Sequence, residues 1–256
     1  MKNHLLLIFL FFCSFSLKAT DKTIPLKSIK VLVYTKNGKG YVHDNIASAV
    51  ACIQKMGQEQ GFKVDTSSNP AVFTTPNLKQ YTMLIFTSTN NDVFATDEQR
   101  VAFRDYMEAG GGFVGIHSVT GTERNWTWFK QMVGCTFLIH PPFQKFTVKV
   151  IAPNSPLVRG IPKVWQHEDE CYFGKEWYPG ITVVMANDLT TLNAAAADIK
   201  DKAVGSFSNI YPSVWYQHFD GGNIWITALG HAKESYSDPI FTTLILNGIK
   251  FYQPRF

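Results

Sequence analysis

The chain has 256 residues, a formal net charge of +4 and 45% hydrophobic residues, which suits one large domain with a substantial core. The positive excess is small and scattered, so the composition argues against a nucleic-acid partner. The four cysteines show neither a CxxC motif nor a zinc-finger spacing, so we expect no disulfide scaffold and no cysteine-ligated zinc.

The first residues have the pattern of a secretory signal peptide. Lys2 gives a positive start, residues 5–12 are apolar, and Ala19 provides a small residue for cleavage. The apolar run is shorter than the roughly 20 residues of a membrane-spanning helix. Bulky residues before Cys13 argue against a lipoprotein anchor. We therefore expect residues 1–19 to be removed and residues 20–256 to form a single exported domain, periplasmic or secreted.

Strands and helices are predicted to alternate through the first half of the chain. Continuous apolar runs typical of strands buried on both faces alternate with segments of helical periodicity. Strands are predicted at 29–34, 62–65, 81–86 and 113–116, and helices at 45–61 and 96–109. This alternation indicates parallel pairing and a doubly wound α/β sheet.

The second half has a different pattern. Short strands separated by prolines are expected to form antiparallel edge strands, and the parallel pattern is expected to return before a closing helix. The predicted short strands are 145–151, 170–173 and 181–186; the later strands are 214–218 and 223–228, and the helix is 239–251. Residues 219–222 have the composition of a hairpin turn.

The run from Gly110 to Ser118 is the most informative segment. Its glycines end a helix, residues 113–116 form a buried strand, and His117 and Ser118 follow at the turn. In open α/β sheets the ligand crevice lies beyond the carboxyl ends of the strands, so His117 is expected on a solvent-lined turn. A lone histidine here could equally be a core residue bonded to a backbone carbonyl.

Two more histidines follow predicted strands in the same way. His43 comes after the first strand and His231 after the last, so all three histidines should lie at one edge of the sheet. His140 lies in a loop that could reach the same crevice, whereas His218 falls inside a strand and is expected to be structural. Neutral histidines bind divalent metals, so His43, His117 and His231 are a candidate zinc site.

An acidic segment at 165–172 supplies candidate carboxylates. Asp169 or Glu170 could orient a histidine and act as a general acid or base, although a solvated acidic turn is the simpler explanation. The loop containing Gly38 and Gly40 lacks the third glycine of a dinucleotide fingerprint and the GK[ST] of a P-loop, which argues against nucleotide binding.

The order of these motifs resembles the ThuA-like (trehalose utilisation) family, in the class I glutamine amidotransferase-like superfamily. The matching pieces are Tyr-Val-His-Asp at 41–44, Gly-Gly-Gly-Phe-Val-Gly-Ile-His-Ser at 110–118, Val-Gly at 133–134, His-Pro at 140–141, Asp-Glu-Cys-Tyr at 169–172, Pro-Ser-Val-Trp at 212–215, Gly-Gly at 221–222 and Leu-Gly-His at 229–231. The resemblance covers about residues 29–251.

The resemblance implies a flavodoxin-like three-layer fold and a role in the use of disaccharides or 3-keto-sugar derivatives. On this basis His117, Asp169, Glu170 and His231 are candidate catalytic residues, and His43, Ser118, His140 and Tyr172 are candidate substrate-binding residues. The superfamily places a nucleophilic cysteine where this chain has His117, so glutamine amidotransferase activity is not expected. Ser118 lacks a surrounding Gly-x-Ser-x-Gly, which argues against a serine nucleophile.

Two functions remain open at this point. The first is an enzyme that shifts protons on a saccharide in an isomerisation, elimination or glycoside cleavage, with or without a metal. The second is a non-catalytic saccharide-binding module. The sequence does not determine whether the protein forms oligomers.

Overall fold

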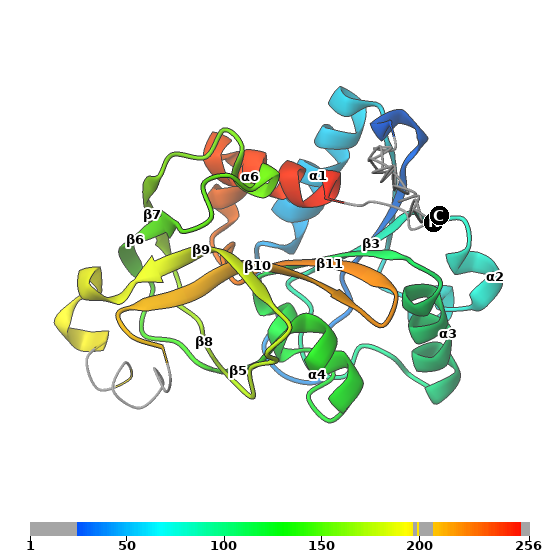
Figure 1. Ribbon diagram of the computed structural model, residues 1–256. Coiled ribbons are helices and arrows are strands. Elements are labelled where there is room, and N and C mark those ends of the chain that lie inside the picture. The colour runs from blue at the N-terminus through cyan, green and yellow to red at the C-terminus, as the bar shows by residue number, and fades with distance from the viewer. Residues whose placement is uncertain (1–24, 197–198, 200–206, 252–256) are drawn as a thin grey trace, which may run out of the picture.

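The computed structural model describes residues 25–196, 199 and 207–251, so the predicted signal peptide and its cleavage site lie outside the described residues. A nine-stranded sheet forms the centre, in the order β2-β1-β3-β4-β11-β10-β9-β6-β7 (Figure 1). Its strands are β1 (Lys30–Tyr34), β2 (Lys63–Ser67), β3 (Met83–Thr87), β4 (Gly112–Ile116), β6 (Gln144–Val150), β7 (Val164–Asp169), β9 (Thr182–Asp188), β10 (Ile210–Phe219) and β11 (Gly222–Thr227). The strands β5 (Thr136–Ile139) and β8 (Phe173–Lys175) pair separately.

Helices cover both faces of the sheet, which gives the three layers of a flavodoxin-like fold and confirms the predicted fold class. The helices are α1 (Ile46–Gln60), α2 (Thr75–Leu78), α3 (Asp97–Glu108), α4 (Thr127–Val133) and α6 (Pro239–Lys250). Helices α1 and α6 lie on one face, and α3 and α4 lie on the other (Figure 1). No helix in the described part of the chain has the length and apolar character needed to cross a bilayer.

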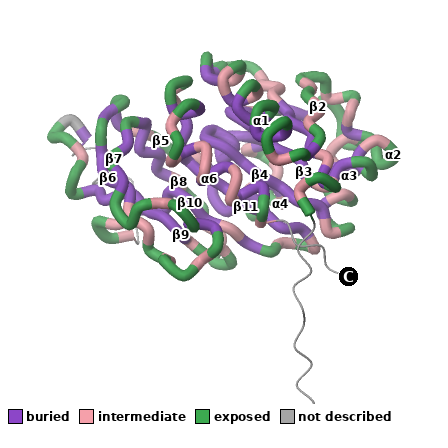
Figure 2. Tube along the Cα trace, turned by 90° about the horizontal axis from the view of Figure 1, so that it is seen from above, coloured by how far each residue is buried: buried purple, intermediate pink, exposed green. Residues whose placement is uncertain are grey.

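Each face of the sheet has its own apolar core. Val31 and Val33 of β1 point to the face where Ile53 of α1 and Leu244 of α6 pack. Leu32 and the other alternate residues of β1 point to the opposite face, where the large aromatic side chains are Phe86, Phe103, Phe113 and Phe129. This alternation explains why the central strands are buried along their whole length (Figure 2).

Parallel pairing holds in only half of the sheet. Strands β2, β1, β3, β4 and β11 are parallel. The strand β10 is antiparallel to β11, so the expected return of parallel pairing at 214–218 is wrong. A two-residue turn joins these strands, with Asp220 and Gly221 both at positive φ, and such a tight turn can connect only antiparallel neighbours.

The predicted strand at 170–173 is also wrong in its position. The strand β7 ends at Asp169, and only Phe173 of the predicted segment belongs to a strand, β8. The Glu170 backbone N–H donates to the Asp169 side chain at 2.8 Å rather than to a neighbouring strand, so the ladder stops there. Residues 170–172 therefore cross between the two sheets.

The topology brings several strand ends to one edge. The parallel strands β1, β4 and β11 end at the same edge by construction. Successive antiparallel pairings from β11 through β10, β9 and β6 give β7 the same direction as β11. Glu170 therefore leaves β7 at the edge where the loops after β1, β4 and β11 begin.

Candidate active site

Four side chains converge at this edge of the sheet. His43, His117, Glu170 and His231 each offer one ligand atom, and these atoms all lie within 4.8 Å of one another. They come from the loops after β1, β4, β7 and β11. The three histidines thus share one site, as the strand positions predicted, while the chemical role of each remains a prediction.

The backbone presents His117 at a sharp turn. Its φ of 58° lies in the left-handed region, which a non-glycine residue adopts only at some energetic cost. This conformation ends β4 and starts the short 3-10 helix His117–Gly121. The side chain is fully buried, so the expectation of a solvent-lined turn is wrong: the rings of His43, Tyr172 and His231 pack around it.

Hydrogen bonds behind the rings set the tautomers of two histidines. The Nδ1 of His117 lies 3.2 Å from the carbonyl oxygen of Ala228, which can only accept, so Nδ1 carries the proton. The hydroxyl of Ser118 donates to Thr89 O, so its oxygen accepts from Nδ1 of His43 at 3.4 Å. Both rings therefore turn an unprotonated Nε2 toward the centre of the site.

These two Nε2 atoms lie only 3.0 Å apart. A proton between them would relieve the repulsion of the lone pairs, but the environment disfavours it. Burial, reinforced by the neighbouring histidines, lowers the pKa of His43 to about 3. Burial also lowers the pKa of His117 to about 4, against the opposing effect of Asp169 and Glu170. At neutral pH both rings are uncharged, and their lone pairs face each other.

Glu170 and His231 complete the group. The Nδ1 of His231 lies 3.0 Å from Glu170 Oε2, and this carboxylate raises the pKa of the ring. The angles at this short contact are not those of a hydrogen bond, and Nδ1 of His231 has no hydrogen-bond partner among the described residues. The same carboxylate oxygen lies 3.8 Å from Nε2 of His117. Glu170 therefore contacts both His231 and His117 through one carboxylate oxygen.

Tyr172 and His140 line the open side of this group. The Tyr172 hydroxyl lies 3.0 Å from Nε2 of His117, and the ring of His140 stacks on that of Tyr172 with centroids 5.4 Å apart. The Nδ1 of His140 lies 3.5 Å from Glu170 Oε1, and the His140 side chain is about one-third exposed. His140 therefore reaches the site as the sequence suggested, whereas His218 is exposed on β10, away from it.

Asp169 is predicted to face the histidines as an acid or base, and the structure gives it a different place. Its carboxylate is fully buried and accepts from the backbone N–H groups of Gly230 at 2.6 Å and His231 at 3.1 Å. It also accepts from Glu170 N and from Nε2 of His167. These donors offset the cost of burial and lower its pKa. Asp169 thus ties the end of β7 to the turn at Gly230 and His231, and its role as an acid or base stays a prediction.

Sequence reasoning missed two further supports. Asn45 is buried at the start of α1, and its amide group donates to Gly230 O at 2.6 Å and His231 O at 2.9 Å. His167 holds the Asp169 carboxylate in place through a hydrogen bond from its Nε2. The only local signal for Asn45 was an amide residue beside His43 at a helix start. These supports keep the His231 turn in register with the loops that carry His43 and Glu170.

The cysteines of the described residues are not among the four converging side chains. Cys52, Cys135 and Cys171 are buried free thiols. Cys171 lies next to Glu170 in the sequence, but burial raises the pKa of its thiol to about 12, so it is not a nucleophile at neutral pH.

Comparisons with known proteins identify the family and the fold. A protein-family model described as "Trehalose utilisation" (ThuA) matches residues 30–252. A sequence search of curated proteins finds no match.

Solved structures with a similar fold include two ThuA-like proteins. The one from Bacteroides uniformis ATCC 8492 has a TM-score of 0.71 and 20% identity, with 88% of this chain and 91% of that chain covered. The one from Parabacteroides merdae ATCC 43184 has a TM-score of 0.69 and 19% identity, with 88% and 89% covered. A cytoplasmic protein from Salmonella typhimurium has a TM-score of 0.60 and 13% identity, with 89% and 100% covered. With the family model spanning most of its length, the chain belongs to the ThuA, or trehalose utilisation, family, which points to a carbohydrate-related function.

Proposed function

We propose that this protein is a carbohydrate-processing enzyme whose active site is a divalent metal centre formed by His43, His117, Glu170 and His231. The approach of Nε2 of His43 to Nε2 of His117, 3.0 Å apart, is the observation that carries the proposal. The partners of the two Nδ1 atoms imply that both Nε2 atoms are unprotonated. Two such atoms approach closely when a cation lies beside both of them. Histidine ligands typically donate their other ring nitrogen to a fixed partner, as these rings do to Ser118 and Ala228.

The donor set fits zinc best. Zinc is commonly bound by imidazole nitrogens and carboxylate oxygens at about 2.0–2.2 Å, and tetrahedral donors then lie about 3.4 Å apart. The contacts of 3.0 Å and 3.8 Å within the group bracket this spacing. Soft thiolate ligands are not in the group, and three imidazoles disfavour magnesium and calcium.

A bound zinc ion would polarise a sugar oxygen and make its proton, or the proton beside a carbonyl, easier to remove. The chain's own groups would then move protons around that oxygen. His140 is partly exposed beside Glu170 Oε1, so its ring is within reach of a bound sugar and of solvent. Tyr172 can donate a hydrogen bond to that oxygen, because burial raises the pKa of this phenol well above its usual value and so keeps the hydroxyl protonated.

This acid–base arrangement supports isomerisation, elimination or glycoside cleavage of a disaccharide or its 3-keto derivative, since each of these reactions requires proton transfer at a sugar oxygen or at the carbon next to it. A saccharide-binding module without turnover is the second candidate. The exposed ring of Tyr41, which contacts His43 edge-on with centroids 4.8 Å apart, favours it because exposed rings stack on sugars. The convergence of titratable groups favours the enzyme.

The test combines metal analysis with a substrate screen. We expect purified protein to contain about one zinc ion per chain by mass spectrometry, to lose turnover of trehalose or 3-keto-trehalose on chelation, and to regain it when zinc is restored. His231→Ala should lower the zinc content, whereas the matched change His218→Ala on β10 should not. Full turnover by protein without metal would refute the metal centre, and sugar binding without turnover would identify the binding module.

We further propose that the protein is exported after removal of residues 1–19, on the strength of the Lys2 start, the apolar run and Ala19. Intact mass spectrometry of the periplasmic or secreted protein tests this directly. A mass beginning at Thr20 supports export, and a cytosolic product that retains Met1 contradicts it.

A further inference from the structure

A second cavity opens beside His231, on the same edge of the sheet as the four-residue site. Its volume is about 470 Å³, within the range of about 300–1,000 Å³ for small-molecule sites. It is bounded by the ends of β6 and β7 on one side and by residues 232–238 on the other. The cavity is therefore formed by segments that also position the candidate active site.

The cavity directly adjoins the active site. Ala232, which follows His231, is part of its lining. Phe143 also lines it, and the ring of Phe143 packs against that of His231 with centroids 5.6 Å apart. The buried His167 forms part of the wall and bonds Asp169 behind the site. A molecule that touches the proposed metal ligand His231 can thus extend past Phe143 into this cavity.

Phe143 is unusual for an aromatic residue in this chain. Most phenylalanine side chains of the described residues lie in the two cores, but Phe143 is 42% exposed. An exposed aromatic face in the wall of a cavity favours a ligand that covers it, because the apolar area is then removed from water. The apolar C–H face of a sugar ring is a suitable cover, since it stacks on an aromatic ring while its hydroxyls stay hydrogen-bonded.

The remaining walls are polar and carry charges of both signs. Glu168, Glu234 and Asp238 contribute carboxylates, and Lys145 contributes an ammonium group. Carboxylate oxygens accept from sugar hydroxyls, and the ammonium group donates to them. Three carboxylates against one ammonium group repel an anionic ring such as a sugar phosphate. The lining therefore suits an uncharged polyhydroxylated ring.

We propose that this cavity is the subsite for a second, uncharged sugar ring of the substrate, with Phe143 as its stacking platform. The inference rests on the proposed function, because it places the first ring at the His43, His117, Glu170 and His231 site. It also makes a disaccharide, rather than a monosaccharide, the preferred ligand. The two rings would be joined close to the ring of His231.

The experiment compares a two-ring with a one-ring sugar. Titration calorimetry of the full-length, zinc-loaded protein with trehalose and with methyl α-D-glucoside should show trehalose binding about tenfold tighter or more. In Phe143→Ala that ratio should fall to about twofold or less, with the affinity for methyl α-D-glucoside and the zinc content unchanged. Phe143→Tyr should keep the ratio, and so should Val101→Ala, which shortens an exposed apolar residue on α3.

The outcomes separate the subsite from the proposed function. Equal affinities for the two sugars in the unmodified protein, or an equal loss for both in Phe143→Ala, would overturn the subsite and leave the carbohydrate function standing. If neither trehalose nor methyl α-D-glucoside binds the zinc-loaded protein, the carbohydrate function and the subsite are overturned together. Loss of zinc in Phe143→Ala would show that this ring supports the metal ligands instead.

Discussion

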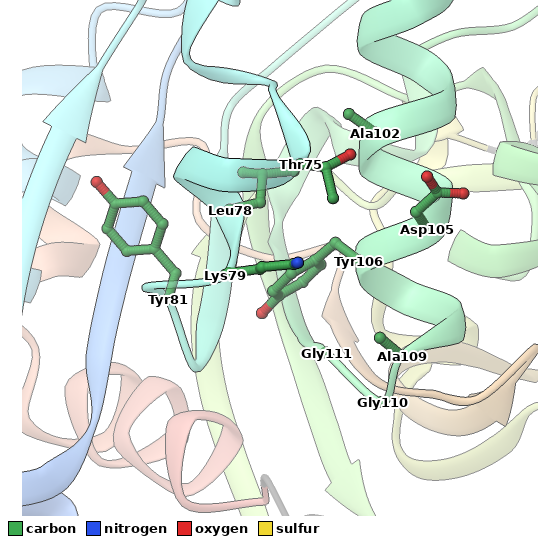
Figure 3. A pocket seen from close by; sticks show the side chains of 10 residues that line it. All are labelled: Thr75, Leu78, Lys79, Tyr81, Ala102, Asp105, Tyr106, Ala109, Gly110 and Gly111. Carbon is green, nitrogen blue, oxygen red and sulfur yellow. The ribbon is translucent and has the colours of Figure 1, made fainter.

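Two pockets at opposite edges of the same sheet differ in how their polar groups are satisfied. The pocket at the amino-terminal ends of β3 and β4 has a volume of about 230 Å³ and lies between α2 and α3 (Figure 3). Its tyrosines already have protein partners: Tyr81 donates to Asp65 at 2.8 Å and Tyr106 donates to Gly112 O at 3.2 Å. At the carboxyl edge, by contrast, Nε2 of His43 and Nε2 of His117 face each other 3.0 Å apart, and the Tyr172 hydroxyl also lies 3.0 Å from the His117 atom. Nδ1 of His231 has no hydrogen-bond partner among the described residues.

The difference supports placing the proposed chemistry at the carboxyl edge of the sheet. A satisfied polar group stabilises a protein, whereas a buried group left unsatisfied costs about 1–3 kcal/mol and persists where something else requires it. Most of the residues labelled in Figure 3 belong to α2 or α3 or directly follow one of these helices. The histidines instead follow strands, where the left-handed φ of His117 aims a ring into a common space.

The largest expected effect comes from removing the inward-facing imidazole of His117. His117→Ala should lower turnover by about 10²–10⁴-fold, because a metal ligand and an orienting group are both lost. The ring is buried and donates to Ala228 O, so we also expect a loss of about 1–3 kcal/mol in the free energy of unfolding. Activity per folded molecule and zinc content are the measurements.

The exposed His218 provides the control for this change. His218→Ala should leave turnover and zinc content within about twofold of the unmodified protein. If His117→Ala retains full activity per folded molecule and full zinc content, His117 is a core histidine and the proposed centre is wrong.

A smaller effect is expected from changing Asp169, which accepts hydrogen bonds from the backbone of Gly230 and His231. Asp169→Asn keeps the size of the side chain but replaces an oxygen by an NH₂ group facing backbone N–H donors. We expect zinc affinity to fall by about 10–100-fold, as for other changes behind metal ligands. Competition with a chelator of known affinity measures this. A change in turnover at saturating zinc, with zinc affinity unaltered, would return Asp169 to an acid–base role.

The parallel half of the fold was predictable because its information is local. Apolar runs such as residues 113–116 specify strands buried on both faces, and the histidines that follow three of them could be assigned to one edge. The antiparallel half was less predictable, because short half-buried strands acquire their partners through tertiary packing. The precise role of Asp169 depends on Gly230, 61 residues away, and no local pattern encodes that bond.

Stability should depend on pH in a direction set by the two buried rings. The pKa of His43 is lowered to about 3 and that of His117 to about 4, from an ordinary value of about 6.5. As the pH falls from about 6.5 toward 4, the unfolded chain takes up protons that the folded chain does not, so stability falls. Each ring contributes about 1.4 kcal/mol per pH unit at most. The raised pKa of His231 acts in the opposite sense, since its contribution is lost as the pH rises through that value.

Denaturant unfolding of the metal-free protein between pH 7 and pH 5 measures this dependence. We expect His43→Gln to reduce the slope of stability against pH, and His218→Gln, on the exposed surface, to leave it unchanged. The lowered pKa of Asp169 adds a loss of stability at still lower pH, as its carboxylate becomes protonated. A slope that is identical in the unmodified protein and in His43→Gln would show that His43 is not held neutral by the fold.

The smallest effect is expected at the opposite edge, where polar groups are already paired. Tyr106→Phe removes the hydroxyl that donates to Gly112 O and leaves the ring in place, so the free energy of unfolding should fall by about 0.5–1.5 kcal/mol.

Gly112 begins β4, the strand that ends before His117, so this change also tests whether the two edges of the sheet are coupled. We expect them to be independent, because the intervening strand is rigidly paired on both sides with β3 and β11. Zinc affinity and turnover measured beside thermal unfolding should therefore be unchanged in Tyr106→Phe. A loss of zinc affinity comparable to that of Asp169→Asn would show that the pocket at the amino-terminal edge is energetically coupled to the histidines through β4.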